Sequence, residues 1–172
     1  DHHLGLFVFL QFRRKQCAPS GPLLVAAPSE CVRFFRGMLA VFGTADVGVE
    51  GTDFILESFD SLVGKQLPIS ASEPSTLLEK YLVERGWNAA VFEVDHPAGA
   101  HGMVMRRNSA PTTSSFLYTG DTQPCASIPR WGADVAVLIH EATFAQDKVH
   151  EARQRRHSTV DEAISCGNEC GA

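Results

Sequence analysis

The sequence predicts a mixed α/β fold in which helices are layered against a sheet. Segments with the 3.6-residue periodicity of amphipathic helices alternate along the chain with short apolar runs typical of strands. No internal repeat or low-complexity tract interrupts this alternation. A length of 172 residues fits one domain and is enough to bury a core.

The first half of the chain predicts helices separated by strands. In order, we expect a helix at 4–15, a strand at 22–27, a helix beginning at 28–29, a strand at 52–56 and a helix at 75–85. The apolar inner faces of the second and third helices are expected to carry Val32, Phe35, Leu39, Phe42, Leu77, Leu78 and Leu82. Gly86 is expected to end the third helix. The segment 43–74 is otherwise ambiguous.

The second half predicts a sheet followed by two helices. Strands are expected at 88–94, 102–106, 114–119 and 135–139, with a loop at 109–115 and helices at 146–155 and 158–166. Because the run from Val135 to Ile139 is continuously apolar, it predicts a central, buried strand.

Composition narrows the class of protein. A formal net charge of −5 argues against a chain coated in basic residues for nucleic acid, but it does not exclude a nuclease, because bound zinc ions would add local positive charge. The basic clusters at 13–15, 106–107 and 153–156 are each interpreted most simply as solvated faces. Five scattered cysteines, without zinc-ribbon spacing, indicate reduced thiols in an intracellular protein. No apolar run approaches the ~20 residues of a membrane span.

Polar side chains follow three predicted strands. His96 closes one strand, Asp121 another, and His140 with Glu141 a third, while Asp1-His2 precedes the first helix. Functional groups gather at strand ends because loops converge there on a rigid sheet. Imidazole nitrogens and carboxylate oxygens are the ligands of hydrolytic zinc sites. The pattern therefore predicts a metal-dependent hydrolase, although Glu141 could instead be a buried ion-pair partner.

Four motifs follow one another along the chain: Asp1-His2-His3-Leu4-Gly5-Leu6, Gly120-Asp121-Thr122, His140-Glu141-Ala142-Thr143 and His157-Ser158-Thr159. In this order they resemble those of ribonuclease Z, the tRNA 3′-processing endonuclease of the metallo-β-lactamase superfamily. Asp1-His2-His3-Leu4-Gly5-Leu6 is similar to the end of the family's HxHxDH motif. The segment 118–125 resembles its GDT motif, 138–144 its HEAT loop and 157–159 its HST motif. The resemblance is to the C-terminal half of the long form, and it implies part of an αββα four-layer sandwich.

The resemblance also implies residue roles. Asp1 and His2 would ligate one zinc ion, with Asp1 helping to activate the attacking water, and His96 would ligate a second zinc ion. Asp121 would bridge the two metals. His157, oriented by Glu141, would donate a proton to the leaving ribose oxygen. His140 and Thr122 would support this arrangement without touching metal.

The implied activity is removal of the 3′ trailer from precursor tRNA with two zinc ions. We expect residues 1–172 to be a partial catalytic domain that lacks the His-x-His before Asp1 and the last zinc-binding histidine, and that is inactive alone. The expected partners are precursor tRNA and either a second copy or an N-terminal half of the same protein, with no membrane. The expected location is intracellular: the nucleus or mitochondrion for a eukaryotic long form, otherwise the cytoplasm.

Two other functions stay open. One is a different metallo-β-lactamase-fold hydrolase, such as a phosphodiesterase or thioesterase. The other is a non-catalytic platform domain that binds RNA or protein. The HEAT and HST motifs argue against the first alternative. The presence of six motif residues argues against the second: Asp1, His2, His96, Asp121, Glu141 and His157.

Overall fold

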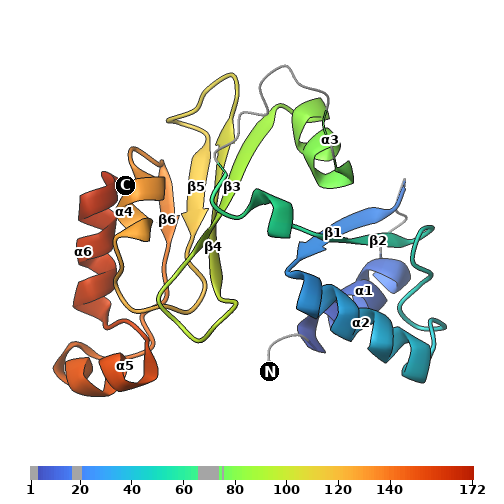
Figure 1. Cartoon of the computed structure of the whole chain (residues 1–172), viewed down its shortest axis with the longest axis horizontal. Helices are drawn as coiled ribbons and strands as arrows, with labels where there is room; N and C mark the ends of the chain where they lie inside the picture. The colour runs from blue at the N-terminus through green and yellow to red at the C-terminus, as the bar shows by residue number, and fades with distance from the viewer. Residues whose placement is uncertain (1–3, 17–20, 66–73, 75) are drawn as a thin grey trace. The chain divides into compact units, whose positions relative to one another are not determined.

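The computed structural model describes residues 4–16, 21–65, 74 and 76–172, which form two compact units (Figure 1). The first unit comprises 1–61 and the second 62–172, and each is described by itself. A short 3₁₀ turn at Asp60–Leu62 joins them in sequence. The expectation of one partial catalytic domain over 1–172 stays a prediction.

The first unit packs two helices against a two-stranded parallel sheet. Its elements are α1 (Leu4–Gln16), β1 (Leu23–Ala27), α2 (Ser29–Phe42) and β2 (Phe54–Ser58), and β1 pairs with β2 from Leu23↔Phe54 to Ala27↔Ser58. Buried side chains on the inner face of α2 meet those of β2, which confirms the predicted positions 32, 35 and 39. Phe42 was predicted to be buried but is 74% exposed, because the helix ends there, at Gly43.

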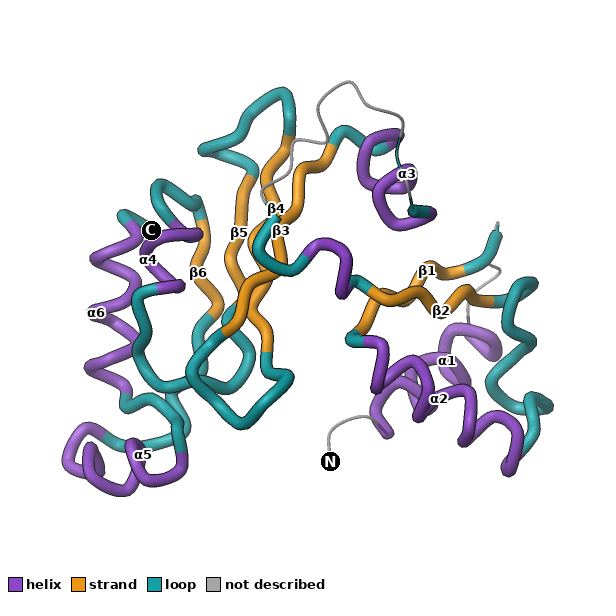
Figure 2. The backbone as a smooth tube through the Cα atoms, in the orientation of Figure 1, coloured by secondary structure: helices purple, strands orange, loops and turns teal. Residues whose placement is uncertain are grey.

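The second unit is built around a four-stranded sheet (Figure 2). Its strands are β3 (Trp87–Glu93), β4 (His101–Arg107), β5 (Ser115–Tyr118) and β6 (Val137–Ile139), in the spatial order β3-β4-β5-β6. Its helices are α3 (Leu77–Glu84), α4 (Ser127–Gly132), α5 (Val149–Arg155) and α6 (Val160–Cys170), with a 3₁₀ turn at Gln146–Lys148. The pairs β3–β4 and β4–β5 are antiparallel, whereas β5–β6 is parallel.

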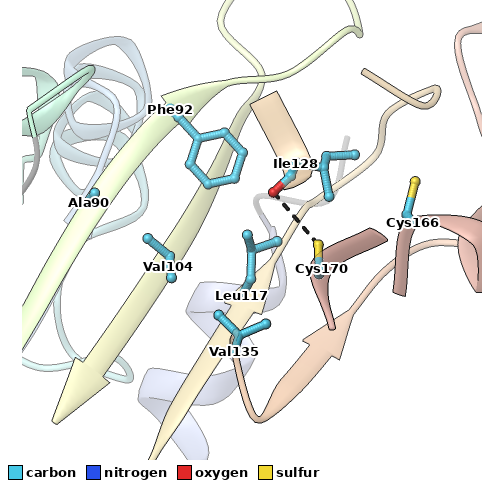
Figure 3. Close-up of a cluster of buried hydrophobic side chains, with 8 residues drawn as sticks. All are labelled: Ala90, Phe92, Val104, Leu117, Ile128, Val135, Cys166 and Cys170. Carbon is cyan, nitrogen blue, oxygen red and sulfur yellow. Dashed lines mark hydrogen bonds between the residues drawn. The ribbon is translucent and has the colours of Figure 1, made fainter. Parts of the chain in front are cut away.

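The core of this unit lies between the sheet and helices α4 and α6 (Figure 3). Phe92 and Leu117 from the sheet meet Ile128 of α4 and Cys170 of α6, and the Cys170 Sγ donates to the Ile128 carbonyl at 3.8 Å. The Phe92 ring also lies close over Gly102 on the neighbouring strand, where a Cβ would come within 2.6 Å of the ring. Glycine at 102 is therefore a packing requirement.

Two expectations for the second unit need correction, and one helix has no predicted counterpart. The strand predicted as central, 135–139, forms the shorter β6, which lies at an edge of the described sheet with Val137 and Ile139 about half exposed. An apolar run cannot by itself distinguish an edge strand from a central one. Helix α4 was not predicted. The last helix begins at Val160, later than expected, because Thr159 forms a capping box with Glu162.

The topology brings three strand ends together. Strands β3 and β5 run in the same direction because each is antiparallel to β4, and β6 is parallel to β5. The carboxyl ends of β3, β5 and β6 therefore lie at one end of the sheet, next to His96, Asp121 and His140. Among the described helices, none is long and apolar enough to cross a membrane.

Candidate metal centre

Side chains from three loops converge at this end of the sheet. His96, Asp121 and His157 each offer a ligand atom, and these atoms all lie within 4.8 Å of one another. His96 and His157 are half-buried with their ring centroids 4.9 Å apart, whereas Asp121 is exposed. Two imidazoles and a carboxylate are a donor set that suits zinc.

The loop that follows β3 fixes one nitrogen of His96. Its Nδ1 donates to the Arg156 carbonyl at 2.7 Å, and the Arg156 Nη1 donates back to the His96 carbonyl at 3.2 Å. Because a carbonyl oxygen can only accept, the proton lies on Nδ1 and the lone pair on Nε2. Arg156 reaches this position in a left-handed conformation (φ 55°, ψ 48°) at the end of α5. His96 is thus oriented as metal-binding histidines usually are.

The loop after β5 holds Asp121. Gly120 adopts a positive φ of 64°, which allows the sharp turn into Asp121. Gln123 then ties this loop to the His96 loop: its amide N–H donates to the Asp95 carbonyl at 3.1 Å, and its Nε2 donates to the Asp95 carboxylate at 2.5 Å. These bonds keep Asp121 and His96 at a common edge although they are far apart in sequence.

Glu141, in the loop after β6, connects this loop to the loop after β5 and to the segment between α5 and α6. Its Oε1 accepts from His157 Nδ1 at 2.6 Å and from the Thr122 amide at 2.9 Å, while its Oε2 accepts from the Thr143 amide at 3.1 Å. Burial by itself would raise the pKa of Glu141, but hydrogen bonds from Thr143 and from the Thr122 amide outweigh it, so the pKa is lowered. The group is a carboxylate at neutral pH and holds the His157 ring in place.

His140 supports the same loop. Its Nδ1 donates to the Glu141 carbonyl at 2.7 Å, and its Nε2 is buried without a hydrogen-bond partner among the described residues. The fully buried Ser158 hydroxyl donates to the Thr122 carbonyl at 2.7 Å, and backbone pairing of Phe144 with Thr159 joins the HEAT and HST motifs. The two motifs therefore form one structural unit.

The predicted site residues are placed as follows. His96, Asp121, Thr122, Glu141 and His157 come together, with His140 bracing the loop, whereas Asp1 and His2 lie outside the described residues. His157, predicted as a proton donor, also lies among the potential ligands.

Three positioning residues were missed by sequence reasoning: Gln123, Arg156 and Ser158. Ser158 stands inside the quoted HST motif and could have been singled out there. The hydrogen bonds from His96 to the Arg156 carbonyl and from Gln123 to Asp95 leave no local sequence signal, because each joins segments at least 28 residues apart.

Comparisons with known proteins identify relatives over the whole chain, although no protein-family model matches it. The chain is 31% identical over 176 residues to ribonuclease Z, mitochondrial, of Drosophila melanogaster, covering all of this chain and 21% of that protein. It is 30% identical to tRNase Z TRZ3, mitochondrial, of Arabidopsis thaliana (98% of this chain, 23% of the relative). It is also 30% identical to human zinc phosphodiesterase ELAC protein 2 (100% and 20%). The chain thus spans about a fifth of the length of these relatives.

Solved structures show the same fold. A long-form RNase Z from yeast matches with a TM-score of 0.76 at 16% identity, over 97% of this chain and 25% of the yeast chain. The metallo-β-lactamase-fold protein YhfI from Bacillus subtilis matches with a TM-score of 0.65 at 17% identity, over 99% and 57%. The sequence relatives and the shared fold together establish that this chain is homologous to the long-form ribonuclease Z proteins and has the metallo-β-lactamase fold.

Proposed function

We propose that the protein to which this chain belongs is a zinc-dependent endoribonuclease that removes the 3′ trailer from precursor tRNA and leaves a 3′-hydroxyl on the tRNA. The observation that carries this proposal is the convergence of His96, Asp121 and His157, with Glu141 bonded to His157. The names of the relatives, ribonuclease Z and zinc phosphodiesterase, support the same chemistry.

The donor set fits zinc. His96 would hold a metal through the lone pair on Nε2, and Asp121 would hold it through its carboxylate oxygens. Asp1 and His2 are proposed to supply further ligands to a two-zinc site, whose remaining histidines are expected outside residues 1–172. When bound, zinc makes water more acidic and stabilises negative charge on the phosphate oxygens.

His157 is proposed to act as the general acid. Its Nδ1 is committed to Glu141, so its Nε2 is the nitrogen that can deliver a proton to the leaving 3′-oxygen of the tRNA. Glu141 keeps the His157 ring oriented. Glu141 is itself held by the Thr122 amide, which donates to its carboxylate, and by His140, which donates to its backbone carbonyl. Ligation of a metal would use the same Nε2, so the two roles exclude each other.

Measuring the zinc content distinguishes a general-acid role of His157 from a metal-ligand role. In the full-length protein, His157→Ala is expected to abolish cleavage of precursor tRNA while the zinc content and the affinity for the RNA stay near their original values. His96→Ala, as the matched histidine variant, is expected to lower the zinc content as well. Loss of zinc from His157→Ala would instead make His157 a ligand.

The same assays test the alternative functions. A protein that hydrolyses a small phosphodiester such as bis-p-nitrophenyl phosphate but not precursor tRNA would be another hydrolase of this fold. If the protein binds precursor tRNA but contains no zinc and does not cleave the RNA, it is a non-catalytic platform domain. Pairing with a second copy or with an N-terminal half, and a mitochondrial or nuclear location, are part of the proposal; the names of the fly and plant relatives support the mitochondrion.

A further inference from the structure

A polar hollow lies in the same unit as the metal centre but is lined by other residues. It has a volume of about 310 Å³ and is lined by Asn88 and Arg106 from the sheet and by Arg130, Trp131 and Ala133 from α4 and the residue after it. We call it the Arg–Trp hollow. Its size is that of a small ligand or of one nucleotide of a longer chain.

The hollow is distant from the metal centre. Asn88 pairs with Arg106 near the amino end of β3, whereas His96 follows the carboxyl end of that strand. Seven residues of extended strand span about 20 Å. A ligand in the hollow therefore cannot touch the reacting atoms, but an RNA chain held at the metal centre could reach both places.

The hollow is cationic in a chain whose net charge is −5. Arg106 donates through Nη2 to the carbonyls of Trp131 (3.2 Å) and Ala133 (2.7 Å), and the Arg130 guanidinium lies 5.9 Å from the centre of the Trp131 ring. Among the residues that the structure describes, neither Arg106 nor Arg130 forms an ion pair with a carboxylate. Two arginines without acidic partners in one concavity suit an anion.

Aromatic rings accompany the arginines. Trp131 stacks on the buried Phe92 with centroids 5.9 Å apart and planes inclined by 11°, which holds the indole rigid. Arg107 also lies over Trp87 at 5.0 Å, but successive side chains of a strand alternate, so this pair lies on the opposite face of the sheet from Asn88 and Arg106 and is not part of the hollow. Arginines interleaved with rings are typical of surfaces that hold RNA phosphates and stack bases.

We propose that the Arg–Trp hollow binds one nucleotide of the RNA substrate, with its phosphate on Arg106 and Arg130 and its base against Trp131. The Asn88 amide offers both a donor and an acceptor to the base edge. This inference rests on the proposed function, since it names a second contact for the same RNA. An acidic peptide would use the arginines but would have less use for the indole.

The test uses the full-length protein and precursor tRNA, with Arg130→Ala as the main variant. Arg130 is exposed, so its removal should not disturb folding, which thermal unfolding checks. Arg33→Ala is the matched control: it removes the same charge from a side chain that is 71% exposed and belongs to the first unit. Arg130→Lys keeps the charge but loses the planar fork.

We expect Arg130→Ala to raise the Kd for precursor tRNA and the KM for its cleavage roughly five- to tenfold, with kcat unchanged, because the hollow is distant from the reaction. The slope of log Kd against log salt should fall in magnitude by about 0.7–0.9, the value for one lost phosphate contact. Arg130→Lys should recover part of the affinity. Arg33→Ala should change neither quantity.

Equal Kd values and equal salt slopes for Arg130→Ala and Arg33→Ala would overturn the proposal. A fall in kcat with unchanged KM would also overturn it, because it would place the effect in the chemistry. If the unaltered protein neither binds nor cleaves precursor tRNA, the proposed function fails first, and the RNA site fails with it. If cleavage is normal in every variant, only the Arg–Trp hollow is refuted.

Discussion

Glu141 is expected to be the brace of the metal centre, and Glu141→Ala tests this. The substitution removes the acceptor of the Thr122 amide, which belongs to a fully buried residue, and of the Thr143 amide, which belongs to an exposed one. Water can replace the partner of Thr143 but not that of Thr122. An unsatisfied buried amide costs about 1–3 kcal/mol, so the Thr122 amide should exchange with solvent roughly 5- to 150-fold faster.

Hydrogen exchange followed by mass spectrometry on peptides covering 118–145 of the full-length protein measures this effect locally. Glu141→Gln is the informative partner variant, because its side-chain oxygen can still accept from Thr122 while the charge beside His157 is lost. We expect near-normal exchange but strongly reduced cleavage from it. Glu169→Ala, an exposed carboxylate on α6, serves as the control. Unchanged exchange at Thr122 in Glu141→Ala would refute the bracing role.

Three further predictions concern packing, thiol chemistry and helix capping. Gly102→Ala should destabilise the fold by about 1–3 kcal/mol in denaturant unfolding, and much less in a Phe92→Leu background; equal losses in both would contradict the packing argument. Burial raises the pKa of the Cys166 thiol to about 11, so its alkylation at pH 8 should be about 100-fold slower than that of an ordinary thiol, and rapid labelling of native Cys166 would disprove this. Because the pKa is raised on folding, the contribution of Cys166 to stability should be present below pH ~9 and lost as the pH rises toward 11. Thr159→Ala should cost about 1 kcal/mol in the same unfolding assay through loss of the α6 capping box, whereas an unchanged midpoint would show that the cap is dispensable.

The elements that formed as predicted are those whose signal is local. Helix α2 follows from the spacing of Val32, Phe35 and Leu39, and α3 ends beside Gly86, which has a positive φ. The prediction failed where the outcome depends on neighbours. The strand that ends at Ile139 has an apolar composition compatible with a central place in the sheet. It lies at an edge of the described sheet because β5 is the one described strand that pairs with it.

The sequence by itself determined the types of chemical group and the strand ends that carry them, because a motif such as Gly120-Asp121-Thr122 or His157-Ser158-Thr159 is read within a few residues. Only the tertiary structure decided which groups meet. The bond from His96 to the Arg156 carbonyl spans 60 residues, and that from Glu141 to the Thr122 amide spans 19. The shared direction of β3, β5 and β6, which no local periodicity encodes, places His96, Asp121 and Glu141 at one end of the sheet. The segment between α5 and α6 brings His157 and the Arg156 carbonyl to the same place through contacts that are equally distant in sequence.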